Sequence, residues 1–170
     1  MSMKSVLSFL LVAVAFSASA MNVNSDGILQ ADGPWEMEQA SNPGVWIPAK
    51  VPGTVLATLV ENGIVPEPYQ GLNNKYDLKL IPDLRENRDF YTVTYRTKVV
   101  LPKEWEGRKI FIRPEGINYR SEIRLNGQTA AVTAGMFQRT VVDVTHLARA
   151  GETNDLVVKV SPLDFPGGPG

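Results

Sequence analysis

Two glutamates, Glu36 and Glu38, have a spacing that could support acid–base chemistry. Side chains two residues apart on a strand share one face and lie roughly 6.5 to 7 Å apart. Carboxyl groups about 5 to 9.5 Å apart can divide acid and base work on one substrate bond. Trp35 and Met37 alternate with the glutamates, however, as in a strand that buries its apolar residues and leaves its glutamates in solvent. The sequence therefore favours a structural role for this pair.

The other titratable candidates are isolated. Asp83 and Glu115 are lone carboxylates in expected loops, where such groups usually stabilise turns. His146 is the only histidine and the chain has no cysteine, which argues against a catalytic triad or a transition-metal site. Asp143 and Thr145 are better explained as side chains that hydrogen-bond the backbone where a strand bends into a turn. We therefore assign no catalytic residue, metal ligand or cofactor, and leave open only calcium bound by scattered backbone oxygens.

Aromatic residues offer another chemistry, because flat rings stack on the apolar faces of sugars while a few fixed polar groups bind the hydroxyls. Tyr69 and Asn73 share a loop that two prolines stiffen, and Tyr119 lies in another expected loop. These three are the candidate carbohydrate-binding residues. Trp46 and Trp105 also lie in or near expected loops, but tryptophan is highly buried on average, so packing against the core is the favoured role for both.

The charges of the chain nearly cancel, with 17 Lys and Arg against 18 Asp and Glu. They are scattered along the sequence, so they form no basic patch of the kind that binds nucleic acid or an anionic membrane. A neutral ligand such as a carbohydrate fits this balance better, and we expect no nucleic-acid partner.

The first residues have the layout of a secretory signal peptide. Lys4 supplies a positive start, an apolar run extends from Val6 to Phe16, and Ala18 and Ala20 form a small-x-small cleavage signal. The run is well short of the roughly 20 apolar residues that a membrane-spanning helix needs. We therefore expect a signal peptide over residues 1–20, cleavage after Ala20, a secreted or periplasmic location, and one mature domain over residues 21–170.

Short runs of alternating apolar and polar residues, separated by glycine and proline, predict an all-β sandwich. The clearest run, Phe90–Leu101, would place Val93 and Val99 on one face and Arg96 on the other. Asn126–Gly127 predicts a two-residue hairpin turn of type I′, which needs positive φ at both positions. The expected strands are Trp35–Ala40, Phe90–Leu101, Arg108–Arg113, Arg120–Leu125, Gln128–Val132, Phe137–Val142 and Asp155–Ser161.

One segment departs from the β pattern and predicts a single short helix. Apolar residues recur at helical spacing between Val55 and Val60, Thr54 can cap the first turn, and Gly63 can end the last. Its apolar stripe needs burial, so the helix would plug one open end of the sandwich. Regular structure should end near Ser161, because proline and glycine dominate the residues that follow.

Several stretches together resemble the N-terminal sugar-binding domain of family two glycoside hydrolases, in the branch of exo-β-glucosaminidases and β-mannosidases. The stretches that carry the resemblance are Trp46–Gly63, Pro66–Asn73, Glu115–Gly127, Gly135–Thr145 and Gly151–Pro162. They cover nearly all of the expected mature chain. The resemblance implies a galactose-binding-like jelly-roll sandwich that precedes an immunoglobulin-like domain and a TIM barrel, with the catalytic glutamates in the barrel.

The resemblance also implies what this chain lacks. The acid/base glutamate of the family directly follows an asparagine, and no Asn-Glu dipeptide occurs in this sequence. The sandwich would also lack its closing strand, so we expect marginal stability or self-association through an unpaired strand edge. The implied role is a non-catalytic accessory domain of an enzyme that hydrolyses β-glucosaminides or β-mannosides without a cofactor. Its partners would be the carbohydrate and the TIM barrel.

Two alternatives remain open from the residues alone. A free-standing secreted carbohydrate-binding module would use Tyr69 and Asn73 for weak binding dominated by ring stacking. A sandwich that only binds proteins would instead recruit a partner strand to its exposed edge. Binding that disappears in Tyr69→Ala would favour the first.

Overall fold

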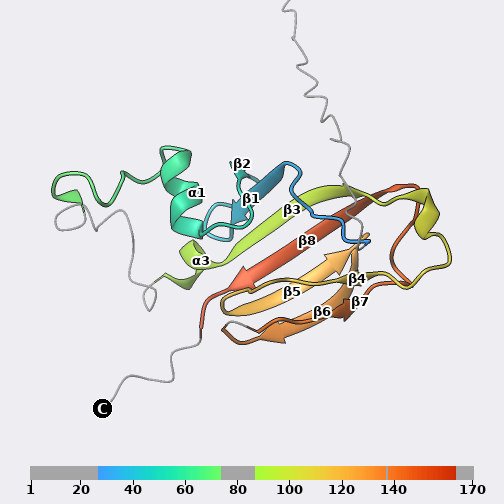
Figure 1. The fold of residues 1–170 in the computed structure, drawn as a ribbon. Coiled ribbons are helices and arrows are strands. Elements are labelled where there is room, and N and C mark those ends of the chain that lie inside the picture. Colours follow the sequence, from blue (N-terminus) through green and yellow to red (C-terminus); the bar gives the residue numbers. More distant parts are fainter. Residues whose placement is uncertain (1–26, 74–86, 137, 164–170) are drawn as a thin grey trace, which may run out of the picture.

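The computed structural model describes residues 27–73, 87–136 and 138–163, and most of their regular elements are β-strands (Figure 1). The expected signal peptide, residues 1–20, lies outside these ranges. Six strands form one antiparallel sheet in the order β2-β1-β3-β8-β5-β6, and two short strands form a second sheet, β4-β7. The strands are β1 Trp35–Gln39, β2 Trp46–Ala49, β3 Val93–Val100, β4 Phe111–Ile112, β5 Arg120–Leu125, β6 Gln128–Ala134, β7 Val142–Asp143 and β8 Thr153–Ser161.

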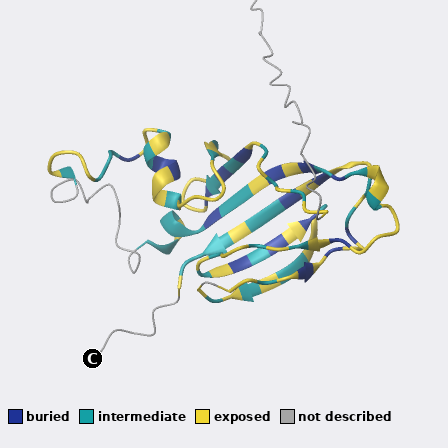
Figure 2. Cartoon of the chain, in the orientation of Figure 1, coloured by how far each residue is buried: buried dark blue, intermediate teal, exposed yellow. Residues whose placement is uncertain are grey.

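The six-stranded sheet has one apolar face and one charged face, because successive side chains alternate. In β3, Val93 and Val99 are buried while Arg96 and Lys98 are exposed, as the alternation predicted. Figure 2 shows this alternation of buried and exposed residues along the strands. The register places Glu36 of β1 directly opposite Arg96. Residues of opposite charge therefore meet on the outer face while apolar residues meet on the inner one.

The small sheet and its flanking turns cover part of the inner face. We call the cluster they form with the large sheet the main core, and its buried members are Trp35, Val99, Leu101, Ile110, Ile123, Leu125, Val142, Val144, Leu147 and Leu156. Each such side chain contributes on the order of 1.5–3 kcal/mol when it leaves water. A sheet of two short strands faces a sheet of six strands, so the sandwich is open in the described residues. The expected all-β sandwich is therefore confirmed as an open sandwich.

The predicted helix is present as α1, Val55–Glu61, and its ends are built as the sequence indicated. Thr54 caps it, because its side-chain oxygen accepts a hydrogen bond from the Ala57 N–H over 3.1 Å. At the other end Gly63 adopts φ 68° and its N–H donates to the Val60 carbonyl over 2.9 Å. Such a reversal satisfies carbonyls that the last turn leaves unbonded.

A second cluster, which we call the helix core, joins α1 to the large sheet. It consists of Met37, Leu59, Val65 and Val93. Met37 and Leu59 both have 0% exposure. The helix thus lies against the part of the inner face near β1 and β3, as Figure 1 shows, and buries its apolar stripe there as predicted.

The hairpin between β5 and β6 has the predicted two-residue turn. Leu125 pairs with Gln128, and the residues between them, Asn126 and Gly127, adopt φ 52° and 81°. Both central positions therefore have the positive φ of a type I′ turn.

Two elements near the helix core differ from the sequence prediction. Residues 88–91 form a short helix, α3 Arg88–Tyr91, although the expected strand began at Phe90. The Asn87 side chain accepts from the Phe90 N–H over 3.1 Å, and this cap favours a helical turn before β3. Strand β2 was not expected, because its sequence contains Pro48 and lacks clear alternation; as an edge strand it tolerates proline.

The second sheet is much shorter than predicted. The expected strand over 108–113 is reduced to β4, and in the expected strand 137–142 residues 138–141 form no strand, so that pairing begins at Val142. Residue 137 lies outside the described ranges. The alternating sequence fits an extended chain here, but β4 and β7 pair only through Phe111–Asp143 and Ile112–Val142.

A 3₁₀ turn, η2 Lys103–Trp105, follows β3. No helix in the described ranges has the length and apolar character needed to cross a membrane.

Candidate functional site

The two glutamates with catalytic spacing, Glu36 and Glu38, are both engaged by neighbouring groups on the outer face of the large sheet. Arg96 Nε donates to Glu36 Oε2 over 2.7 Å, and the same guanidinium lies 3.7 Å from the centroid of the Trp46 ring. Glu38 accepts a hydrogen bond from the Gly44 N–H. A pair held in this way fits the structural role that the sequence favoured.

The isolated titratable residues also occupy structural positions. Glu115 accepts from Arg113 over 3.0 Å and lies 3.5 Å from Arg139. His146 is exposed after β7, and within the described ranges no group of three or more His, Asp or Glu side chains could hold a metal ion. Asp83 lies outside the described residues.

Asp143 and Thr145 form the turn that the sequence predicted. Asp143 Oδ1 accepts from the Thr145 N–H over 3.0 Å and from its hydroxyl over 2.6 Å. These two hydrogen bonds favour the carboxylate form and lower the pKa of Asp143. The Thr145 hydroxyl oxygen in turn accepts from the Ile110 N–H over 2.9 Å. The turn therefore ties the end of β7 to the segment before β4.

The candidate loop after α1 presents Tyr69 to solvent and uses Asn73 for its own conformation. Tyr69 is 90% exposed, and its N–H donates to Glu67 Oε1 over 3.2 Å. Asn73 Nδ2 donates to the Glu67 carbonyl over 2.8 Å, so the amide that was expected to meet a ligand already bonds the backbone. The role of both residues in carbohydrate binding stays a prediction.

Tyr119, the third candidate, lies immediately before β5 and is half-buried. Its N–H donates to the Ser161 carbonyl over 3.4 Å, and its own carbonyl accepts from the Gly135 N–H over 3.1 Å. In the described part of the chain, no hydrogen bond, ion pair or ring contact joins it to Tyr69 or Asn73. The structure thus does not bring the three candidates into one site.

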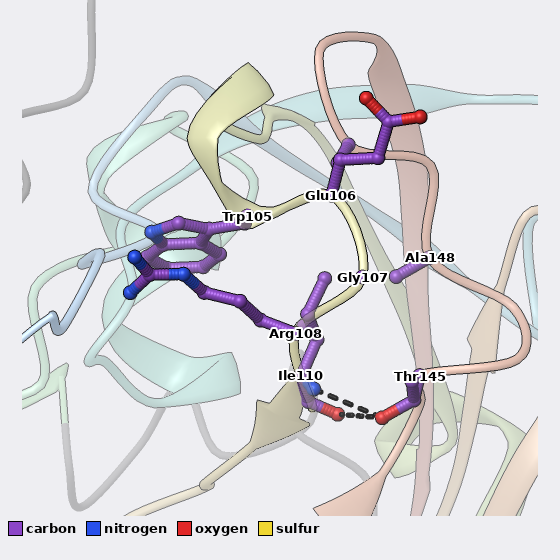
Figure 3. A pocket seen from close by; sticks show the side chains of 8 residues that line it. Trp105, Glu106, Gly107, Arg108, Ile110, Thr145 and Ala148 are labelled. Carbon is purple, nitrogen blue, oxygen red and sulfur yellow. Dashed lines mark hydrogen bonds between the residues drawn. The ribbon is translucent and has the colours of Figure 1, made fainter.

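An open pocket of about 230 Å³ lies elsewhere, between the segment that links β3 to β4 and the turn that follows β7. Trp105, Glu106 and Arg108 line it from the first segment, and Thr145 and Ala148 line it from the second. Figure 3 shows the Trp105 ring and the Arg108 guanidinium on one side of the pocket, with Glu106 extending to the other. An indole beside a guanidinium and a carboxylate can stack on a ring and hydrogen-bond its substituents.

Comparison with known proteins identifies the family of this chain. The sequence model of the family described as the glycosyl hydrolase 2 galactose-binding domain-like domain matches residues 35–164. A mannosylglycoprotein endo-beta-mannosidase from Lilium longiflorum is 38% identical over 122 residues, which is 72% of this chain and 12% of that protein. An exo-beta-D-glucosaminidase from Arthroderma benhamiae is 33% identical over 119 residues, 66% of this chain and 12% of that protein.

A solved structure agrees with these relatives. The crystal structure of a beta-D-mannosidase from Dictyoglomus thermophilum superimposes with a TM-score of 0.61 at 31% identity, and the match covers 76% of this chain and 15% of that one. The chain therefore spans only a small part of the length of the proteins it resembles.

Proposed function

Because the chain belongs to the galactose-binding-like domain family of glycosyl hydrolase 2 enzymes, we propose that it works as a non-catalytic domain of a longer glycoside hydrolase. In that enzyme it packs against a catalytic domain and helps to shape the sugar-binding region. The observation that carries this proposal is the family match over residues 35–164, in a chain that corresponds to 12% of its enzyme relatives.

The carboxylates of the described residues support a non-catalytic role. Retaining and inverting glycosidases need one carboxyl group with a raised pKa as acid and a second as nucleophile or base. Glu36 and Glu115 are instead ion-paired with arginines. The pKa of Asp143 is lowered by hydrogen bonds from Thr145. Asp143 is therefore a poor general acid, and both glutamates already have structural partners.

β-Mannosides are the substrate class we favour for the parent enzyme. A plant endo-beta-mannosidase and a bacterial beta-D-mannosidase are 38% and 31% identical to this chain. The exo-beta-D-glucosaminidase relative, at 33% identity, makes β-glucosaminides the second candidate.

We also propose export through the signal peptide over residues 1–20, which leaves residues 21–170 as the mature domain in a secreted or periplasmic protein. The support is the order of Lys4, the apolar run and the Ala18–Ala20 cleavage signal. N-terminal sequencing of the exported protein should begin at Met21, and a sequence that begins at Met1 would contradict cleavage.

Hydrolysis assays with the purified mature chain test the non-catalytic role. We expect no release of nitrophenol from nitrophenyl β-mannoside or β-glucosaminide above the rate of a buffer blank. Activity that copurifies with the chain and falls in Glu36→Gln or Glu38→Gln, with the matched variant Glu104→Gln unchanged, would overturn the proposal and place catalysis in the sandwich itself.

A further inference from the structure

The pocket between the β3–β4 segment and the turn after β7 has walls fixed by backbone hydrogen bonds. In the first wall the Arg108 N–H donates to the Trp105 carbonyl over 3.0 Å. The two walls are joined twice, because the Val144 N–H donates to the Ile110 carbonyl over 2.9 Å and the Ile110 N–H donates to the Thr145 hydroxyl oxygen over 2.9 Å. These hydrogen bonds hold the backbone of both walls in place, which lowers the cost of ordering the walls when a ligand binds.

The tryptophan in this pocket differs from the two others in the chain. Trp35 is 7% exposed and its indole N–H donates to the Ala31 carbonyl over 2.7 Å. The Trp46 ring is covered by the Arg96 guanidinium at 3.7 Å. Trp105 packs against the main core but is only half-buried, and within the described residues its indole N–H has no hydrogen-bond partner. Trp105 is therefore a fixed ring with a free polar group.

The charged groups that line the pocket are also available. Arg108 and Glu106 are exposed, and in the described part of the chain neither side chain makes a hydrogen bond or an ion pair. Some other surface charges are paired, as Lys98 is with Asp155 at 2.8 Å. One cation and one anion at the same pocket offer hydrogen-bond donors and acceptors while their net charge is zero. This combination matches the hydroxyl groups of a neutral sugar.

We propose that this pocket binds one ring of a neutral pyranoside, with the apolar face of the sugar stacked on the Trp105 indole. The hydroxyls then accept from Arg108 and donate to Glu106. A volume of 230 Å³ lies below the roughly 300–1,000 Å³ of pockets for drug-sized ligands, which limits the ligand to about one ring. The site requires no attached catalytic domain, so it goes beyond the accessory role proposed above.

Nitrogen-15 NMR of the mature chain tests this site directly, because the three tryptophans give three indole N–H signals that single Trp→Phe variants can assign. Methyl β-mannopyranoside and methyl N-acetyl-β-glucosaminide would be added up to about 100 mM, since one stacked ring is expected to bind with a Kd on the order of millimolar. We expect the Trp105 signal to move in a saturable way while the Trp35 signal stays in place. A Trp105 signal that does not move with either sugar would overturn the proposal.

Variants give a second readout by calorimetric titration. Trp105→Ala should weaken binding by at least about tenfold, because stacking on a large ring and the area it buries are both lost. Arg108→Gln and Glu106→Gln change exposed side chains and should each weaken it several-fold. Val132→Ala is the matched control, because Val132 is exposed on β6 and does not line the pocket; it should bind as the parent chain does.

These variants keep the proposal falsifiable. If Trp105→Ala loses its native circular dichroism, the two glutamine variants decide. Binding that survives unchanged in both, or that disappears in Val132→Ala, would contradict the pocket. Either result leaves the accessory role untouched, because the hydrolysis assay tests that role separately.

Discussion

Asn154 is the residue whose replacement tests the packing of the domain most sharply. It lies in β8 with 0% exposure. Its Nδ2 donates to the carbonyls of Arg149 and Glu152 over 2.9 and 3.0 Å. Its Oδ1 accepts from the Arg149 N–H and from Asn126 Nδ2, both over 2.8 Å. Through Asn126, which also donates to the Leu147 carbonyl over 2.8 Å, this amide holds together the hairpin, the turn that lines the pocket and β8.

The cost of Asn154→Ala follows from these contacts. Two donors, the Arg149 N–H and an Asn126 Nδ2–H, lose their acceptor, at about 1–3 kcal/mol for each donor left without a partner in the interior. The two lost bonds to carbonyls cost less, since a carbonyl tolerates a missing partner better than an N–H does. Water can reach part of the site, so we expect destabilisation by about 3 kcal/mol. Total stabilities of about 5–15 kcal/mol make this a large loss.

Urea unfolding of the mature chain, followed by tryptophan fluorescence, measures this loss. Asn154→Asp is the isosteric variant, and it should be at least as damaging at neutral pH because it places a carboxylate against the carbonyls of Arg149 and Glu152. Asn42→Ala is the matched control, since Asn42 is exposed and its side chain makes no hydrogen bond within the described residues. A loss for Asn154→Ala as small as that of Asn42→Ala would refute the reasoning.

Three further predictions concern the helix, the hairpin and alkaline pH. Leu59→Ala removes a side chain with 0% exposure and should cost about 2–5 kcal/mol in urea unfolding; a negligible loss would mean that α1 does not unfold with the sheet. Gly127→Ala must hold a Cβ at φ 81° and should cost about 1–2 kcal/mol in thermal unfolding, whereas Gly116→Ala, with open space around its Cβ, should cost less; equal losses would contradict the turn. Burial raises the pKa of Tyr95 above its ordinary 10.0, so the folded state holds the proton more tightly and stability should fall as pH rises above 10.0. Tyr95→Phe should flatten that fall, and an unchanged pH dependence would exclude Tyr95 as its cause.

Local chemistry made much of the fold predictable. Thr54 and Gly63 marked the ends of α1 because their capping requirements are local, and Asn126–Gly127 marked the hairpin because few residues accept positive φ. The lengths of the strands were harder to predict from the sequence. The pairing of β4 with β7 depends on residues far apart in sequence, so alternation alone overestimated both strands.

The candidate site was harder to predict than the fold. A tyrosine in a stiff loop was a reasonable signal, but nothing local revealed that Asn73 would bond the Glu67 carbonyl. The pocket joins Trp105 to a turn that lies about 40 residues later in the sequence. Packing is the usual role of tryptophan, and Trp105 does pack against the main core, so its residue type alone does not indicate the pocket. No local sequence pattern indicated the role of Asn154 either. Its partners Arg149 and Asn126 can be recognised only once β5 and β8 pair.

The size of the native polypeptide that carries this sequence tests the central claim most directly. Antibodies raised against the mature chain should detect, in extracts and medium of the source organism, a polypeptide much longer than 170 residues, and mass spectrometry of that band should find peptides of this chain together with peptides of a catalytic domain. Detection of the short chain alone would contradict an accessory domain of a larger hydrolase and would favour a free-standing carbohydrate-binding module.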